Sequence, residues 1–422
     1  MKALTICLML CAGVASAQEF TTYKGHGGPI MGLDVSASGQ LASASFDNAV
    51  GLWSNDRPTW LDGHGAAVNA VLFPGDGSIV SGADDFTVRR WRDSTSEVIG
   101  QHQGKVAHLA ATPDGAVLAS ASWDGTIGLW GDVTATLSGH GQGVNTVAFS
   151  SDGATLYSGS SDGTIRIWDV ASATAQGVLV THGFGINEMI VGDGWLAYGA
   201  VDGGTRVIDL ATGAQIKDFS LERRPILSMD YHPATDRIAV GDGHGYIMVI
   251  DSAAWRIAQD FRATRQGPVW ALAYSKDGGT IHAGGIDDVI YAWPVALLDD
   301  FDPAIGAETR PFLRQAETMP NGERQFMRKC SICHALTAGP SRKAGPTLYG
   351  VFGRQAGTVP DYRYSPTLTG SDIIWNDTTI DALFDEGPDH YIPGSKMPMQ
   401  VIAAAQDRID LIAYLRTATT ED

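Results

Sequence analysis

The sequence predicts an all-β seven-bladed propeller followed by a small all-α domain, and three observations support this prediction. A histidine-containing turn and a tryptophan recur every 38 residues or slightly more over the first part of the chain. Strand-like runs with alternating apolar residues lie between Asp-Gly turns in these units. After residue 295 the repeats stop, and helix-like segments surround a single C-x-x-C-H motif formed by Cys330, Cys333 and His334.

The first residues are typical of an export signal. A basic start precedes an apolar run over residues 4–14, and Ala15-Ser16-Ala17 offers the small residues of a cleavage site. We expect residues 1–17 to be removed and the mature protein to be periplasmic and soluble, with no transmembrane segment after cleavage. The alternatives are a membrane anchor, although the run is shorter than the roughly 20 residues that span a bilayer, and a lipoprotein cut before Cys11, where Leu10 is bulky.

The net charge and the cysteine content limit which partners and which kind of cross-linking we expect. The formal net charge is −18, which argues against nucleic acid and anionic membranes as partners. Residues 310–422 carry 12 Lys and Arg against 13 Asp and Glu, so nearly all the excess acid lies in the part of the chain before residue 310. Signal cleavage removes two of the four cysteines and leaves Cys330 and Cys333, which does not suggest a disulfide framework.

The repeat unit is best seen in SDGTIRIWDV, residues 161–170, where an acid in a tight turn precedes a tryptophan by six positions. The histidine turns are spaced 38, 38, 38 and 42 residues apart, at His26, His64, His102, His140 and His182. The turn acid and tryptophan recur together as Asp47 and Trp53, Asp85 and Trp91, Asp124 and Trp130, Asp162 and Trp168, and Asp287 and Trp293. In the fifth and sixth units Ile208 and Ile250 replace the tryptophan, and in the sixth His244 also replaces the acid.

These seven units resemble the WD-repeat family from about Glu19 to Val295. A single four-stranded blade cannot bury both of its faces, so the blades are expected to stack around an axis as a propeller. We expect the segment from Glu19 to His26 to close the ring by pairing with the unit that ends at Trp293. The spacing assigns each His–Asp pair to a different blade, which favours hydrogen bonding within blades over a shared metal or catalytic site.

The predicted domains are a signal peptide over 1–17, the propeller over 18–295, a linker over 296–316 and a helical domain over 317–422. The C-x-x-C-H motif of the last domain suits covalent haem, because two thiols can add to the two vinyl groups while the histidine is held under the iron. The alternatives are a zinc site, which lacks a second cysteine pair, and a redox dithiol, which lacks a βαβ context.

The segments AGPTLYGVFGRQAG, YRYSPTL, IIW and YIPGSKM follow the motif in this order. From Glu317 to about Ala418 the chain resembles class I cytochrome c of the mitochondrial and α-proteobacterial type. The resemblance implies one haem c attached through Cys330 and Cys333, with His334 and Met397 as the iron ligands. Such a haem, with both axial positions filled, carries single electrons and leaves no site for a substrate at the iron.

The resemblance also implies roles around the haem. The Pro346 carbonyl would accept the His334 ring N–H, Tyr391 would lie beside Met397, and the haem propionate would be bound by Arg354, Tyr364 and Trp375. The alternatives are Met399 or His390 as the second ligand, and a purely structural role for the two aromatic residues of the propionate site.

A crossing of two helices is also implied by the resemblance, with Gly322 and Phe326 on one helix against Leu411 and Tyr414 on the C-terminal helix.

The leading hypothesis is an exported c-type cytochrome whose propeller is a docking platform for redox partner proteins. One alternative is a dehydrogenase or other oxidoreductase housed in the propeller that passes electrons to its own haem domain. No catalytic constellation is visible in residues 18–295, which favours the carrier over the enzyme. The other alternative is a binding module that senses haem redox state.

Overall fold

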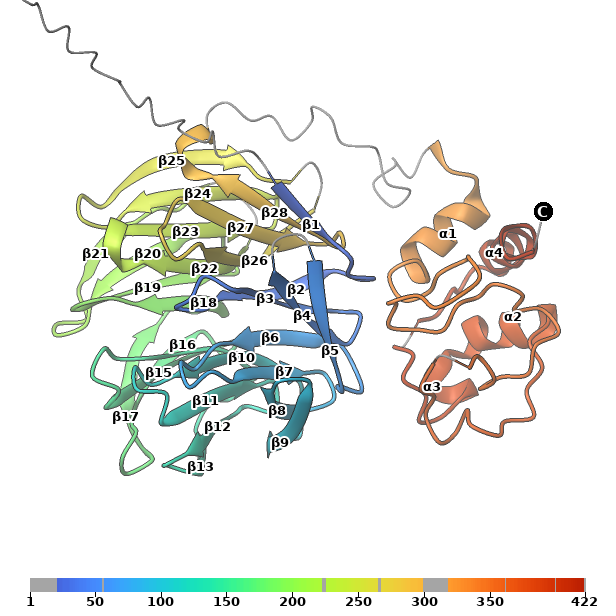
Figure 1. Cartoon of the computed structure of the whole chain (residues 1–422), viewed down its shortest axis with the longest axis horizontal. Coiled ribbons are helices and arrows are strands. Elements are labelled where there is room, and N and C mark those ends of the chain that lie inside the picture. The colour runs from blue at the N-terminus through green and yellow to red at the C-terminus, as the bar shows by residue number, and fades with distance from the viewer. Residues whose placement is uncertain are drawn as a thin grey trace, which may run out of the picture.

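The structure is a computed structural model that describes residues 21–54, 57–221, 225–264, 267–298, 318–360, 362–398 and 400–420. Within these ranges the chain forms seven four-stranded antiparallel sheets, followed by a small helical domain (Figure 1). The predicted all-β propeller and small all-α domain are therefore confirmed. The predicted signal peptide and nearly all of the predicted linker lie outside the described residues.

Each of the first six blades is a meander of four consecutive strands, and the seventh combines three strands with β1. Blades 1 to 4 contain β2 (Ile30–Val35), β3 (Leu41–Ser45), β4 (Ala49–Ser54), β5 (Arg57–Asp62); β6 (Val68–Leu72), β7 (Ile79–Ala83), β8 (Thr87–Arg92), β9 (Thr95–Gln101); β10 (Val106–Ala111), β11 (Val117–Ser122), β12 (Thr126–Gly131), β13 (Ala135–Ser138); and β14 (Val144–Phe149), β15 (Thr155–Ser160), β16 (Thr164–Asp169), β17 (Thr174–Thr181). Blades 5 to 7 contain β18 (Ile186–Val191), β19 (Trp195–Ala200), β20 (Thr205–Asp209), β21 (Gln215–Asp218); β22 (Ile226–His232), β23 (Arg237–Asp242), β24 (Tyr246–Asp251), β25 (Arg256–Arg262); and β26 (Val269–Tyr274), β27 (Thr280–Gly285), β28 (Val289–Pro294), β1 (Thr21–Lys24).

The ring closes through β1, which pairs antiparallel with β28 from Thr21 opposite Ala292 to Lys24 opposite Val289. The predicted closure is thus confirmed. The first strand of each blade contacts the first strand of the next, and β26 contacts both β22 and β2. Closure in this way leaves no first or last blade with an exposed inner edge.

Buried polar networks hold blades 1 to 4 together, as blade 4 illustrates. Nδ1 of His140 lies 3.0 Å from an Asp162 carboxylate oxygen, and Nε2 lies 2.7 Å from the Ser158 hydroxyl. The indole N–H of Trp168 donates to the same hydroxyl at 2.8 Å. Because every polar group in this network has a partner, burial of the tryptophan leaves no orphaned donor. Each of the five His–Asp pairs in blades 1 to 5 of the described chain lies within a single blade, as predicted.

The degenerate fifth and sixth units still form complete blades. In blade 6, Ile250 is fully buried in the position of the tryptophan. Its turn is held by Asp242, whose carboxylate accepts the backbone N–H groups of His244 at 2.8 Å and Tyr246 at 3.0 Å. An apolar side chain in place of tryptophan therefore fills the core without needing the histidine–serine network.

Carboxylates on the inner strands tie neighbouring blades together. Asp34 on β2 accepts the backbone N–H of Phe73 in blade 2 at 2.6 Å, and Asp230 on β22 accepts that of Tyr274 in blade 7 at 2.6 Å. Both acids keep some area open to the ring axis, yet loss of solvation raises the pKa of Asp34 to about 7 and that of Asp230 to about 6.

The helical domain contains α1 (Asn321–Lys329), α2 (Asp377–Glu386), α3 (Pro388–Tyr391) and α4 (Ala405–Ala418), and the 3₁₀ turns η1 (Pro233–Thr235) and η2 (Val295–Leu297) belong to the propeller. The helices α1 and α4 cross closely at Gly322, where a Cβ would lie 2.1 Å from the Asp410 carbonyl oxygen. Phe326 packs on Tyr414 with ring centroids 5.6 Å apart, and Leu411 is fully buried. The predicted helix crossing is therefore confirmed.

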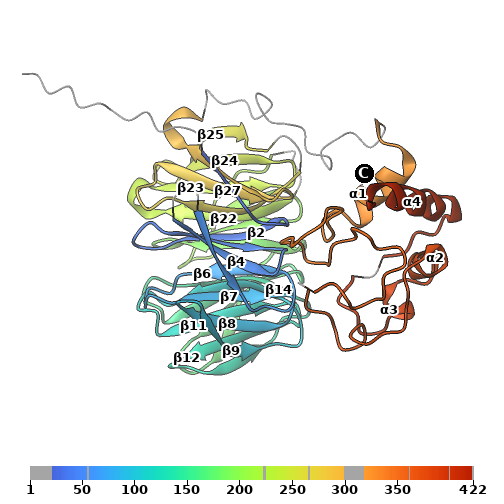
Figure 2. The same cartoon turned by 45° about the vertical axis from the view of Figure 1, so that its right-hand side comes forward.

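The helical domain lies beside the propeller against blades 1 and 2 (Figure 2). In the part of the chain that the structure describes, no helix is both long enough and apolar enough to cross a bilayer.

The raised pKa of Asp34 predicts a specific pH dependence of propeller stability. The folded state retains a proton on Asp34 between about pH 4 and pH 7, where the unfolded carboxyl has lost it. The contribution of this group to the free energy of unfolding therefore falls as pH rises through that window, by at most about 1.4 kcal/mol per pH unit. Chemical denaturation between pH 5 and pH 7 should show a steeper fall in the wild type than in Asp34→Asn, which keeps the contribution of Asp230.

Only the difference between the two proteins is diagnostic, because burial lowers the pKa of His102 and His140 and gives slopes of opposite sign in the same window. The exposed Asp132→Asn serves as the control and should behave like the wild type. Equal slopes in all three proteins would contradict the assignment.

Candidate functional site

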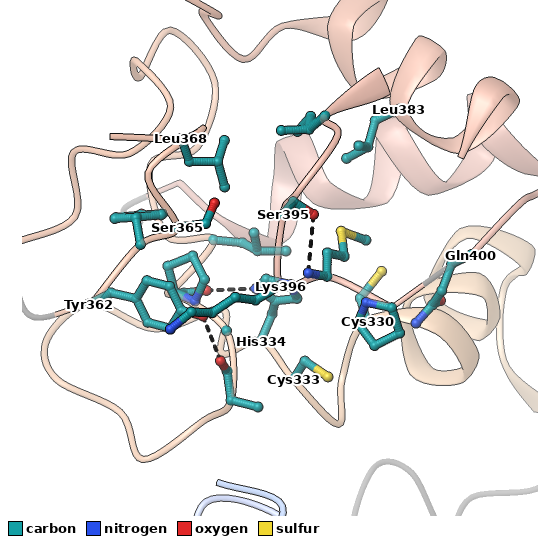
Figure 3. A pocket seen from close by; sticks show the side chains of 18 of the residues that line it. Cys330, Cys333, His334, Tyr362, Ser365, Leu368, Leu383, Ser395, Lys396 and Gln400 are labelled. Atoms are coloured by element: carbon teal, nitrogen blue, oxygen red, sulfur yellow. Dashed lines mark hydrogen bonds between the residues drawn. The ribbon is translucent and has the colours of Figure 1, made fainter. Parts of the chain in front are cut away.

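A cavity of about 1430 Å³, counted with its open side, lies in the helical domain and reaches the propeller. Both cysteines and the histidine of the C-x-x-C-H motif contribute to its wall (Figure 3). Much of the remaining wall is apolar and comes from the helices and the loops between them: Leu348, Val351, Leu368, Ile380, Leu383, Phe384, Ile392 and Leu415. The cavity is thus suited to a large apolar group rather than to a small polar substrate.

The end of α1 places the two thiols at the cavity. The backbone N–H groups of Cys333 and His334 both donate to the Cys330 carbonyl, at 3.0 and 2.9 Å, so the motif forms one tight turn. Burial raises the pKa of Cys330 to about 12 and also raises that of Cys333. A reactive dithiol needs the opposite shift, because the thiolate is the nucleophile. The site therefore does not fit the alternative of a redox dithiol.

The histidine is held in one orientation by its backbone partner. Nδ1 of His334 lies 2.7 Å from the carbonyl oxygen of Pro346. A carbonyl only accepts, so Nδ1 carries the proton and Nε2 keeps the lone pair that binds a metal. Burial also lowers the pKa of His334, which favours the neutral ring. Gly345 permits this close packing, since a Cβ there would lie 2.5 Å from the ring.

Met397 reaches the same cavity from the loop after α3. Its side chain is part of the cavity wall, and its backbone N–H donates to the Ser395 hydroxyl at 3.2 Å. Of the alternatives, Met399 lies outside the described residues, and the side chain of His390 is 71% exposed beside Asp389. Among the described residues of this loop, Met397 is thus the one that offers a soft ligand to the cavity.

The three residues predicted to bind a propionate come together on one wall. Arg354, Tyr364 and Trp375 all line the cavity. The Arg354 guanidinium donates to the carbonyls of Tyr349 and Thr347, each at 2.7 Å, and burial lowers its pKa. A half-buried cation in this wall would favour a ligand that carries a carboxylate.

Two tyrosines near the cavity complete the comparison with the predicted set. Tyr391 is half-buried in the same apolar cluster as Met397 and is not among the described residues that line the cavity, so its role beside Met397 stays a prediction. Tyr362 was missed, although it lines the cavity, donates its hydroxyl to the Ala344 carbonyl at 2.8 Å and packs on Tyr364 with centroids 4.8 Å apart. Its position two residues before Tyr364 in the sequence was the only signal.

The contribution of the propeller to this cavity was not predicted from the sequence. Its open side is lined by six propeller residues, namely Phe46, Asn48, Gly65, Ala66, Ala67 and Asp84. They come from the β3–β4 turn and the β5–β6 loop, and from the end of β7 in blade 2. Contacts between segments almost 300 residues apart leave no local pattern in a single sequence.

The residues present fit a covalently attached haem. Two thiols and a neutral, oriented imidazole lie at one cavity with an apolar wall, a thioether and a buried guanidinium. A zinc site is not indicated, because no group of three or more His, Cys, Asp or Glu residues with metal-binding geometry occurs among the described residues. The fold and the site together define a propeller joined to a haem-binding helical domain.

Comparison with known proteins supports both halves. The family model "WD domain, G-beta repeat" matches residues 17–54, 57–92, 94–131 and 131–169, and the model "Cytochrome c" matches residues 320–419. Cytochrome c of Sesamum indicum is 45% identical over 100 residues, which cover 24% of this chain and 88% of the relative. Cytochrome c of Euglena viridis is 42% identical over 96 residues, covering 23% and 92%.

The WD40 β-propeller domain of Doa1 aligns with a TM-score of 0.59 at 19% identity, over 65% of this chain and 96% of that one, which shows the likeness of fold. Through its C-terminal domain, this chain belongs to the cytochrome c family.

Substitution of the two methionines separates the candidate ligands. With haem bound, Met397→Ala should abolish the weak charge-transfer absorption of a thioether bound to ferric iron, because a soft ligand at the iron is lost. Met399→Ala should retain that absorption. The measurement is the absorption spectrum of the purified ferric proteins, and the reverse pattern would assign the ligand to Met399.

Proposed function

We propose that this protein is an exported one-electron carrier with one haem c attached through Cys330 and Cys333 and ligated by His334 and Met397. The single observation that supports the carrier most is the set of two thiols, neutral imidazole and thioether around one apolar cavity. A bound haem would supply the exchange of one electron between ferrous and ferric iron. The chain supplies the ligands, the attachment and the apolar surroundings.

The proposal links covalent haem attachment to export of the protein. Residues 1–17 would direct export to the periplasm, where covalent haem attachment takes place in bacteria. The order of the segments after the motif supports a class I domain of the mitochondrial and α-proteobacterial type. Arg354, Tyr364 and Trp375 would bind a propionate, because they share one wall of the cavity with a buried cation.

The propeller would serve as the docking platform for a redox partner protein. Aromatic side chains are exposed on the turns that carry the His–Asp pairs, with Trp123 directly before Asp124 and Phe184 two residues after His182. Their exposed fractions are 56% and 58%. Exposed aromatic residues at one rim of a ring are typical of interaction surfaces.

The charge of the propeller indicates the kind of partner. The excess of acidic residues lies before residue 310, whereas the haem domain is nearly balanced. A partner with a basic surface would therefore be steered toward the propeller rather than toward the haem domain.

Covalent attachment is tested by denaturing electrophoresis of protein matured in a periplasm, with haem detected in the gel. The wild type should keep its haem through denaturation, and Cys330→Ala/Cys333→Ala should lose it, because thioether bonds survive unfolding. Ile332→Ala, between the two cysteines, is the matched control and should keep the haem. Loss of haem from the wild type in the gel would refute covalent attachment.

Docking is tested by following haem reduction in a cell-free periplasmic extract. Trp123→Ser/Phe184→Ser should slow the reduction roughly tenfold, since exposed aromatic residues often dominate interface energetics. The control is Val98→Ser/Val178→Ser, which removes exposed apolar side chains from the outer strands β9 and β17. Equal rates for both variants would contradict docking at this rim.

The same assay distinguishes the carrier from an enzyme. A filtrate of the extract that holds only small molecules should reduce the haem slowly if electrons come from a partner protein. Rapid reduction of the wild type by the filtrate would instead favour a propeller-housed oxidoreductase.

A further inference from the structure

The open side of the haem-domain cavity faces the propeller. The cavity wall is completed there by Phe46 and Asn48 from blade 1 and by Asp84 from blade 2, together with residues 65–67 of the loop that joins the two blades. A haem in this cavity would therefore have its accessible side covered by the propeller, and not by solvent alone.

Arg342 anchors the contact between the two domains. Its guanidinium lies over the ring of Trp60, 4.1 Å from the centroid, and forms an ion pair with Asp62. It also lies 3.9 Å from the Asp47 carboxylate. The Arg342 side chain is 29% exposed, whereas that of Asp62 is 68% exposed, so the ion pair remains open to screening by salt.

The Arg342 contact joins the buried His–Asp–Trp network of blade 1 directly. Trp60 packs edge-on against His26 with centroids 4.7 Å apart and against Trp53 at 5.7 Å. Asp47 is also the hydrogen-bond partner of His26 at 2.9 Å. The haem domain is thus docked on the rigid polar network of a blade and not on a loose surface loop.

Two further contacts make the docking specific. Gly27 approaches Arg342 so closely that a Cβ would lie 1.8 Å from the Arg342 carbonyl oxygen. The Lys396 ammonium, at the cavity wall, lies near Gly65 and within the field of Asp85. Basic groups of the haem domain therefore meet acidic groups of the propeller at two places, Arg342 and Lys396.

We propose that blades 1 and 2 are an internal docking surface that gates the haem, with a docked state in which protein-sized redox partners are excluded and an undocked state in which they reach it. This inference rests on the electron-carrier function proposed above. The docked state depends on opposite charges and on one cation–π contact, so salt weakens it. The outer rim around Trp123 and Phe184 stays accessible in both states and can hold a partner nearby until the haem domain undocks.

The test uses the full-length holoprotein and two variants that weaken docking by different means. Arg342→Ala removes the anchor, and Gly27→Ala places a methyl group against the Arg342 carbonyl without changing any charge. Arg328→Ala removes the same charge from an exposed position on α1 of the same domain and is the matched control. Unchanged haem absorption and unchanged amide exchange in the blade cores verify that each variant is folded.

The first readout is amide hydrogen exchange, which needs no electron transfer. In Arg342→Ala and Gly27→Ala, exchange in residues 25–28 and 63–67 should be roughly tenfold faster than in the wild type and in Arg328→Ala. High salt should accelerate the same segments in the wild type. If the docking variants match Arg328→Ala, the two domains are not docked in solution, and the proposal fails whether or not the protein carries electrons.

The second readout is the rate of haem reduction by two probes. Reduction by an added ferrous cytochrome c should be roughly tenfold faster in the docking variants, whereas reduction by dithionite, a small anion, should stay unchanged. Faster amide exchange without faster reduction by cytochrome c would show that the domains dock but that docking does not control access to the haem. Absence of covalent haem would refute the carrier function, and the exchange measurement would still report the contact.

Discussion

Closure of the ring by β1 is the constraint on which the rest of the structure depends. Four residues, Thr21 to Lys24, pair with β28 and complete blade 7 with the N-terminal end of the chain. This pairing completes blade 7, the blade that precedes the haem domain in the chain, and the closed ring places blade 7 next to blade 1. The haem domain contacts blades 1 and 2, although these blades are the most distant from it in sequence.

The same closure explains how a propeller with degenerate repeats remains complete. In blades 1 to 4 a buried serine hydroxyl accepts a hydrogen bond from the indole N–H and also contacts the histidine ring. These bonds fix the orientation of the tryptophan and histidine side chains, in addition to the volume that they fill. In blade 6 an isoleucine fills the core without these bonds. Once the ring is closed, each such blade is packed between two neighbours, and apolar burial suffices for its stability.

Both domains and the centre of the haem site could be predicted from the sequence, because the propeller has a regular repeat and the haem site has a short continuous motif. The 38-residue spacing of His26 to His140 marks separate blades, and the adjacency of Cys330, Cys333 and His334 marks the haem site. The contribution of Tyr362 to the cavity was not predicted, since its neighbours in sequence are the same whether its side chain faces the cavity or solvent. The contacts of Arg342 with Trp60 and Asp62 could not be predicted from the sequence either. A single arginine in a loop belongs to no sequence pattern that would indicate its partner.

Fusion in one chain changes what these contacts can do. Asp62 is 68% exposed and the cation–π pair is a single contact, so between separate proteins this interface would be weak. The covalent link makes docking intramolecular, and a high effective concentration can keep a weak interface mostly formed. A weak contact that is mostly formed can also open readily, which is the property a gate in front of an electron carrier requires. In the proposed function the acidic propeller and the nearly neutral haem domain have different roles, because the propeller would attract a partner while the haem domain would exchange the electron.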